Sequence, residues 1–200
     1  MHVVSVGKGW LEVICGPMFS GKSEELIRRL RRVQIAKMPL QIFKPYVDTR
    51  YDENRIVSHS AQKIDAVCVQ NTVELEQKFL SSTEVLGIDE VQFFDTEIVP
   101  FARTLANRGV RVIVAGLDQD YTGKAFEPMP ALLTEADYVT KTLAICSKCG
   151  APANRSQRLT NNPEQVVIGA TDIYEARCRN CHVPWGEPTT GDLFRQQKIA

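Results

Sequence analysis

The sequence predicts an α/β protein: a mostly parallel sheet with helices on both faces, followed by a small cysteine-rich domain. Three observations lead to this fold class. Short runs rich in Val and Ile alternate with helical patterns between residues 10 and 143, and such runs are typical of strands buried on both faces. A glycine-rich segment stands between the first strand and the first helix. From residue 144 the composition changes to Cys, Asn, Arg, Gly and Pro.

The individual elements follow in order from these patterns. Residues 10–15 form the first expected strand, and residues 22–37 form a helix because their apolar side chains recur at helical spacing. A second helix is expected from a cap at Thr72 through Leu80, and a third within 95–108, where Pro100 obscures the start. The further strands are expected at 40–44, 65–69, 85–89, 110–117 and 137–143.

The change in composition divides the chain into parts. We expect an α/β domain over residues 1–143, a cysteine-containing domain over 144–186 and a weakly patterned tail over 187–200. With 44% hydrophobic residues in 200, the chain has enough apolar side chains for a core without disulfides.

The charge balance excludes some function classes. Lys plus Arg and Asp plus Glu number 24 each, with a pI near 6.8, whereas a protein that binds nucleic acid through phosphates is normally basic. No apolar run reaches membrane-spanning length, and the N-terminal stretch does not resemble a signal peptide, so no membrane partner is expected. Four arginines lie opposite the apolar stripe of the first helix and are interpreted as a solvated face: Arg28, Arg29, Arg31 and Arg32.

The strongest motif is "GPMFSGKS", residues 16–23, which fits the phosphate-loop pattern G-x-x-x-x-G-K-[ST]. It follows a strand and opens a helix, as the mechanism requires, and it makes the fold a P-loop fold of the RecA-like type. Backbone N–H groups of such a loop surround phosphates, and the helix N-terminus adds positive potential. Lys22 would neutralise the outer phosphates and the Ser23 hydroxyl would bind Mg²⁺. ATP and Mg²⁺ are therefore expected. The nucleotide-binding candidates in this loop are Gly16, Pro17, Met18, Phe19, Ser20, Gly21, Lys22 and Ser23.

A second strand should bring an acid to the metal, and "VLGID" ends on Asp89. Glu90 follows it and is placed to accept a proton from the group that attacks the γ-phosphate. The apolar residues after Glu90 favour this role over that of a solvated loop acid. Val91 and Gln92 complete the candidate nucleotide-binding set.

Glu90 does not decide what attacks the phosphate. Water would make the protein an ATPase, and a substrate hydroxyl would make it a kinase. "DEVQ" also resembles the acidic motif of helicase-type ATPases. That alternative is weakened because a helicase usually needs two such sheet domains and a basic channel, and this chain has room for one domain and no net charge.

The cysteines supply the second motif. "CSKC" and "CRNC" are two C-x-x-C pairs separated by 28 residues, which is typical of a structural tetrahedral zinc site formed by Cys146, Cys149, Cys178 and Cys181. His182 is the alternative fourth ligand. Cys15 and Cys68 remain as free thiols in apolar strands, which fits a reducing, cytoplasmic setting. The long loop that the zinc closes is a candidate lid, and "EQVVIGATDIY" is expected to contain a strand.

Together these segments resemble the thymidine kinase family of the cellular, zinc-containing type. The resemblance covers nearly the whole chain and rests on "GPMFSGKSEELIRRLRR", "YVDTRYD", "IDEVQFF", "VAGLDQDYTGKAF" and "CSKC…VVIGATDIYEARCRNC". It implies that ATP phosphorylates the 5′-hydroxyl of thymidine to give dTMP in nucleotide salvage, beneath a zinc-held lasso. It also implies a homotetramer that dTTP inhibits.

The resemblance also implies residue roles. Glu90 would be the catalytic base, Lys22 and Arg50 would stabilise the transferring phosphoryl group, and Asp48 would lie at the reacting end. The residues implied for the nucleoside pocket are Met18, Asp48, Arg50, Phe93, Leu117, Tyr121, Phe126, Ser156, Ile168, Gly169, Ala170, Thr171 and Tyr174.

Two positions depart from the family pattern. Ala170 stands where a second glycine is common, and Tyr121 stands where many members have Phe. Neither is the catalytic carboxylate, so both bear on base selectivity. The pocket should accept deoxyuridine less well than thymidine, since one methyl group is worth ~1–3 kcal/mol. Besides the helicase-like ATPase, a zinc-ribbon interaction protein that binds nucleotide without turnover is the alternative from a different class.

Overall fold

A computed structural model describes residues 9–46, 55–57, 63–160, 162–167 and 173–183. Its centre is one six-stranded sheet in which all neighbouring strands are parallel. The order across the sheet is β5 (Val67–Val69), β2 (Leu40–Pro45), β6 (Val85–Ile88), β7 (Arg111–Gly116), β1 (Trp10–Cys15) and β8 (Tyr138–Lys141). The predicted α/β class is confirmed.

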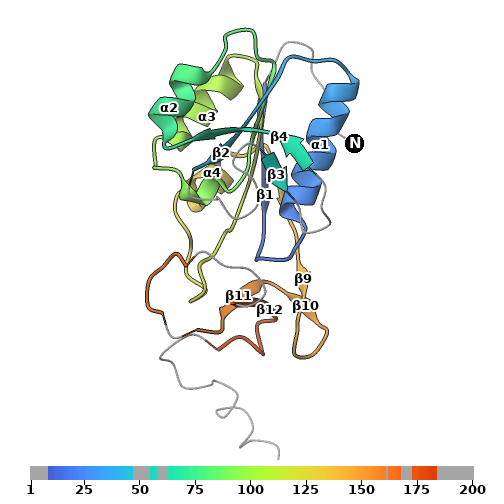
Figure 1. Ribbon diagram of the computed structural model, residues 1–200, viewed down its shortest axis with the longest axis vertical. Helices are drawn as coiled ribbons and strands as arrows, with labels where there is room; N and C mark the ends of the chain where they lie inside the picture. The colour runs from blue at the N-terminus through green and yellow to red at the C-terminus, as the bar shows by residue number, and fades with distance from the viewer. Residues whose placement is uncertain (1–8, 47–54, 58–62, 161, 168–172, 184–200) are drawn as a thin grey trace, which may run out of the picture.

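Helices cover both faces of this sheet (Figure 1). The helix α1 (Lys22–Ile35) packs on one face, where its apolar stripe meets Ile14, Ile42 and Ile113. The other face is covered by α2 (Thr72–Lys78), α3 (Ile98–Asn107) and α4 (Met129–Glu135). Side chains alternate between the faces along each strand, which is why β1 supplies Leu11 and Val13 to one cluster and Ile14 to the other.

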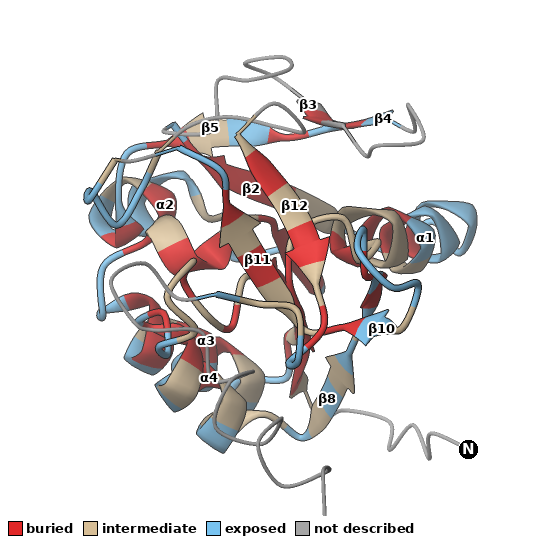
Figure 2. Cartoon of the chain, turned by 90° about the horizontal axis from the view of Figure 1, so that it is seen from below, coloured by how far each residue is buried: buried red, intermediate tan, exposed pale blue. Residues whose placement is uncertain are grey.

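The described residues after β8 form a smaller unit below the sheet, made of two-stranded antiparallel sheets (Figures 1 and 2). In one of these sheets β9 (Ala144–Ile145) pairs with β10 (Pro152–Ala153), and in the other β11 (Arg155–Arg158) pairs with β12 (Tyr174–Arg177). Its core is small and contains Ala144, Ala153 and Ala176 beside the cysteines. A further antiparallel pair, β3 (Arg55–Val57) with β4 (Lys63–Asp65), lies beside α1.

Several expectations need correction. Asn71, not Thr72, caps α2, since its side chain accepts the N–H of Glu74 at 2.9 Å. The expected strand over 65–69 is divided, because Asp65 ends β4 and β5 begins at Val67. The helix α4 and the short strands β3, β4, β9, β10 and β11 were not anticipated. Pro100 lies in the first turn of α3, where a missing N–H costs little.

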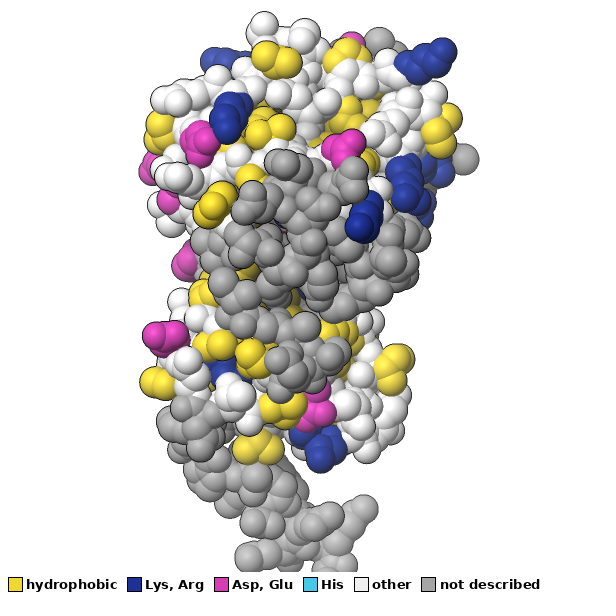
Figure 3. Space-filling model, in the orientation of Figure 1, with side chains coloured by type: hydrophobic (Ala, Val, Ile, Leu, Met, Phe, Trp, Pro, Cys, Tyr) yellow, Lys and Arg dark blue, Asp and Glu magenta, His cyan; other side chains and the backbone are white. Residues whose placement is uncertain are grey.

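The solvated arginine face is correct in part. Basic side chains gather over α1 on the outside of the molecule, as the right side of Figure 3 shows, and Arg28, Arg31 and Arg32 are exposed. Arg29 is not: only 14% of its side chain is exposed, and it pairs with Glu12 at 2.6 Å and Glu25 at 2.7 Å. Among the helices in the described residues, none has the length and apolar character needed to cross a bilayer.

Candidate active site and cysteine centre

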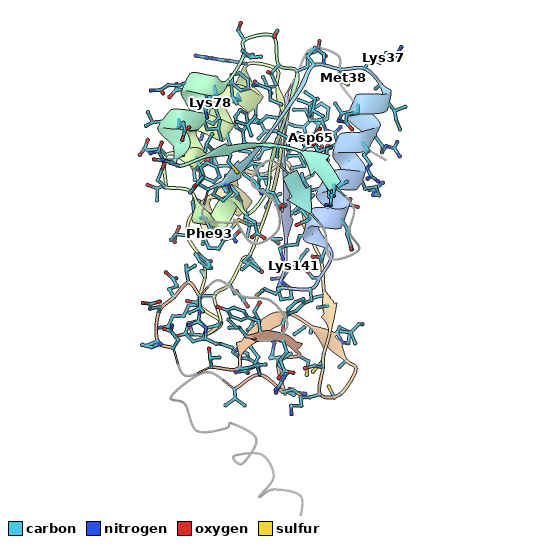
Figure 4. All side chains as sticks on the ribbon, in the orientation of Figure 1. Lys37, Met38, Asp65, Lys78, Phe93 and Lys141 are labelled. Atoms are coloured by element: carbon cyan, nitrogen blue, oxygen red, sulfur yellow. The ribbon has the colours of Figure 1, made fainter. Side chains whose placement is uncertain are left out.

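The candidate site lies at the carboxyl ends of the central strands, where the loops of a parallel sheet converge. The strand β7 stands between β6 and β1 in the sheet. The phosphate loop leaves β1, the two carboxylates leave β6, and Leu117 and Asp118 leave β7. The sheet therefore gathers segments that are far apart in the sequence at one edge. This edge faces the smaller unit, and Figure 4 labels Phe93 and Lys141 at that junction.

The phosphate loop needs glycine at its first position. Gly16 has φ 148°, and a Cβ there would come within 2.4 Å of the Thr142 carbonyl oxygen. Thr142 holds the loop twice: its N–H donates to Cys15 O at 2.8 Å, and its hydroxyl lies 2.8 Å from Ser20 Oγ. Thr142, the residue directly after the edge strand β8, therefore supports the phosphate loop.

Lys22 is buried in this loop, and its ammonium group donates to Pro17 O at 2.7 Å. Burial lowers the pKa of Lys22 below its ordinary value of 10.5, while the negative charges of Glu90, Asp89 and Asp118 act in the opposite direction. The lysine therefore lies among three carboxylates, where an added phosphate would favour its charged form.

Ser23 and Asp89 suit the predicted Mg²⁺ site. Ser23 Oγ lies 3.4 Å from Asp89 Oδ1, and Asp89 is buried. Mg²⁺ prefers oxygen ligands at ~2.1 Å in an octahedron, which puts neighbouring oxygens ~3 Å apart. These two oxygens are close to that spacing, so the residues present fit the ion.

Glu90 occupies a strained turn. Its φ of 50° and ψ of 40° are left-handed, which is uncommon for a residue with a side chain. The turn carries the chain from β6 into a short 3₁₀ helix, Val91–Phe93. Gln92 Nε2 donates to Glu90 Oε2 at 2.6 Å, and Gln92 Oε1 accepts the N–H of Leu117 at 3.0 Å. Strain of this kind clusters at functional sites. Val91, in contrast, is fully buried in the core, which leaves its backbone as the part able to meet a nucleotide.

Asp118 is a site residue that the sequence did not suggest. Its Oδ2 pairs with Lys141 Nζ at 2.6 Å, and its Oδ1 is buried without a hydrogen-bond partner among the described residues. The strands that carry this pair, β7 and β8, flank β1, so the ion pair crosses the start of the phosphate loop. Cys15 lies there, and burial raises the pKa of its thiol to about 11, which keeps it protonated.

Several residues expected in the nucleoside pocket make contacts between different elements. The Phe93 and Phe126 rings meet edge to face at 6.0 Å, and Ser156 Oγ accepts the N–H of Met18 at 3.0 Å. That bond links β11 of the small unit to the phosphate loop. Tyr121 and Tyr174 both approach the Arg158 guanidinium, at 3.7 and 5.3 Å from their ring centres. The remaining expected residues lie outside the described ones: Asp48, Arg50, Ile168, Gly169, Ala170 and Thr171.

The stretch expected to contain a lasso strand, residues 164–174, lies partly outside the described residues, since 168–172 are not among them. Residues 164–167 are not in a strand, and β12 begins at Tyr174. Tyr174 is buried, and its hydroxyl donates to Val167 O at 3.0 Å while it accepts from Arg158.

The four cysteines form the candidate metal centre. Their Sγ atoms all lie within 4.8 Å of one another, and Cys149 Sγ is 3.6 Å from Cys178 Sγ. Four sulfurs around a tetrahedral zinc at ~2.3 Å would lie ~3.8 Å apart, so the geometry fits such an ion. His182 is not in this cluster; its Nε2 lies 2.9 Å from Tyr121 O. His182, the alternative ligand, therefore contacts the loop after β7 and not the four sulfurs.

These features define a class of protein. The phosphate loop and the two carboxylates are those of a P-loop enzyme that uses nucleotides, and the cysteine cluster adds a module able to bind a metal. A family model described as thymidine kinase matches residues 9–182. The chain therefore belongs to the thymidine kinase family, and it is a kinase.

Individual relatives agree with the family model. A thymidine kinase of Rhodothermus sp. (strain ITI 518) is 53% identical over 185 residues, covering 92% of this chain and 86% of the relative. A thymidine kinase of Bdellovibrio bacteriovorus is 48% identical over 195 residues and 96% of each chain. A solved structure of the Legionella pneumophila ATPase DotB gives a TM-score of 0.37 at 18% identity, covering 66% of this chain and 35% of that one, a likeness too distant to support any argument.

Proposed function

We propose that the protein transfers the γ-phosphoryl group of ATP to the 5′-hydroxyl of thymidine, producing dTMP for nucleotide salvage. Membership of the thymidine kinase family supports this reaction over the helicase-like alternative. The observation that carries the residue roles is the convergence of Lys22, Asp89 and Glu90 at the carboxyl ends of β1 and β6, on either side of β7.

Each of these residues has a separate task in the proposal. The loop N–H groups and Lys22 bind the phosphates, and Lys22 neutralises charge as it develops in transfer. Ser23 and Asp89 would hold Mg²⁺, which would supply positive charge against the phosphate oxygens. Glu90, held by the Gln92 amide, accepts the proton of the 5′-hydroxyl. Arg50 and Asp48 keep the roles at the reacting end that the resemblance implies.

The nucleoside side of the site would be formed by both units. Met18, Phe93 and Phe126 would give an apolar slot for the base, and backbone groups of the lasso would read its edge. Loss of the thymine methyl should weaken use of deoxyuridine by about 1–3 kcal/mol, or roughly 10- to 200-fold. Deoxycytidine should be a poorer acceptor still, because its edge donors and acceptors are inverted and would leave buried partners unpaired.

The test is a screen of thymidine, deoxyuridine and deoxycytidine with ATP and Mg²⁺, with the Glu90→Gln variant run in parallel. Removal of the base should lower kcat by about 10²–10⁴. Glu97→Gln, at an exposed acid just before α3, is the matched control and should keep full activity. Wild-type activity on deoxycytidine equal to that on thymidine would contradict the proposed acceptor, and full activity of Glu90→Gln would contradict the proposed base.

The cysteine cluster is proposed to bind one structural zinc ion, since four thiolates leave no open position for chemistry. The division at residue 143 is supported by β8, the last strand of the large sheet, ending at Lys141. A homotetramer, inhibition by dTTP and a cytoplasmic location complete the proposal. Light scattering in solution, dTTP titration of the initial rate and fractionation of cells would test these three in turn.

A further inference from the structure

Arg158, at the end of β11, is buried in an unusual way for a charged residue. Only 3% of it is exposed, and among the residues that the structure describes no carboxylate forms an ion pair with it. Buried arginines normally need an acid partner or a full set of acceptors. Arg158 has the second arrangement, so its charge is spread over several fixed contacts.

All the N–H groups of the Arg158 guanidinium donate hydrogen bonds to segment 162–167 or to Tyr174. Nη1 donates to the carbonyl oxygens of Asn162, at 2.8 Å, and Glu164. Nη2 donates to Gln165 O at 3.0 Å and to the Tyr174 hydroxyl at 2.6 Å, and Nε reaches the same hydroxyl at 3.2 Å. The planar fork of arginine suits this set of acceptors in a way that a lysine ammonium does not.

Tyr121 connects this cluster to the loop after β7. Its ring lies under the guanidinium of Arg158, with the carbon of the cation 3.7 Å from the ring centre. Its hydroxyl donates to Pro163 O at 3.2 Å, and its carbonyl lies 2.9 Å from the His182 ring. The hydroxyl that distinguishes this residue from phenylalanine thus has a structural partner in segment 162–167.

We propose that Arg158 is a positioning residue for nucleoside binding, and that it acts by fastening segment 162–167 to the loop after β7. We call Arg158, Tyr121 and Tyr174 the arginine clasp. The inference rests on the proposed function, because Tyr121, Tyr174 and the residues that follow Val167 in the sequence are those assigned to the nucleoside. The clasp touches neither the phosphate loop nor Glu90 in any contact that the structure describes, so it sets acceptor affinity and not phosphate chemistry.

The test compares Arg158→Lys with the wild-type enzyme. Lysine keeps the charge but offers three donors from one atom, so it cannot serve carbonyls and the tyrosine hydroxyl together. The KM for thymidine should rise at least tenfold, while the KM for ATP stays within threefold and the zinc content is unchanged. Amide hydrogen exchange of residues 162–167 should be at least tenfold faster. Arg103→Lys, at an exposed arginine paired with Glu135 on α4, is the matched control and should change none of these.

Tyr121→Phe is a milder variant that tests the same contacts if Arg158→Lys does not fold. Tyr121→Phe removes only the bond to Pro163 and should raise both the KM for thymidine and the exchange rate about two- to fivefold. Unchanged exchange over 162–167 in a folded variant would overturn the clasp, as would parallel increases in both KM values. Failure of the proposed function has a different signature: wild-type protein would phosphorylate no nucleoside, while the difference in exchange between wild type and variant would persist.

Discussion

Gln92 offers the sharpest test of how the base is positioned. Its side chain is 2% exposed, and its amide joins Glu90 to Leu117 N–H with bonds of 2.6 and 3.0 Å. Replacement by leucine removes both bonds. A hydrogen bond to a charged group contributes about 1.5–3 kcal/mol. At 1.36 kcal/mol per tenfold, kcat should fall by about 10- to 150-fold if that bond orients Glu90 for proton transfer.

Gln92→Leu also leaves the Leu117 N–H without its acceptor, which should lower the free energy of unfolding by about 1–3 kcal/mol. Gln92→Glu separates the two effects. It retains an acceptor for Leu117 N–H but replaces the donor to Glu90 by a second carboxylate, which repels it. Both variants would be measured by steady-state ADP release with saturating thymidine and by urea unfolding. A folded Gln92→Glu enzyme with wild-type kcat would refute the positioning role.

Three further predictions concern the scaffold. Glu12→Gln should lower the free energy of unfolding by about 3 kcal/mol at neutral pH, because two arginines that pair with this buried acid lose their partner. Burial acts to raise the pKa of Glu12, but hydrogen bonds from arginine and tryptophan hold it below 4.5. The difference in free energy of unfolding between variant and wild type should therefore be full above pH 4.5 and shrink as pH falls, as urea titrations would show. Cys149→Ser should abolish stoichiometric zinc, measured by mass spectrometry, and acceptor-dependent turnover, while ATP still binds; retention of one zinc per chain would contradict the four-thiolate site. Gly87→Ala should lower the free energy of unfolding in urea by about 1–3 kcal/mol and leave the KM values unchanged, because the added Cβ would lie 2.8 Å from both methyl groups of buried Leu30. Wild-type stability of this variant would show that the contact relaxes freely.

The sequence predicted the long elements well because their signals are local. β1 and β7 are mostly apolar runs, although β1 contains Glu12 and β7 begins with Arg111, and α1 has a clear apolar stripe. The helix ends at Ile35, two residues before the predicted end, and Lys37 beyond it takes a left-handed φ of 56° that side-chain pattern does not reveal. The seven residues of α4 span too few turns to show periodicity.

The site shows the same difference between local and non-local signals. Some of its residues can be recognised from a short motif, and others only from the residues that they contact in the folded chain. The phosphate loop, Asp89 and the paired cysteines carry their chemistry in a few adjacent letters, and the fold brings the loop and the acid to one edge. Arg158 and Asp118 could not be recognised this way, because the partners that define them come from other elements.

The placement of β7 between β6 and β1 has a consequence for biosynthesis. The strand that separates the loop-bearing strand from the acid-bearing one ends at Gly116, later in the chain than either neighbour. A ribosome that has made only the first hundred residues has already produced Lys22, Asp89 and Glu90, yet nothing can set them at their working separation. These three residues can reach their folded separation only after β7 has joined the sheet, and the nucleoside side of the site depends on residues that are synthesised later still.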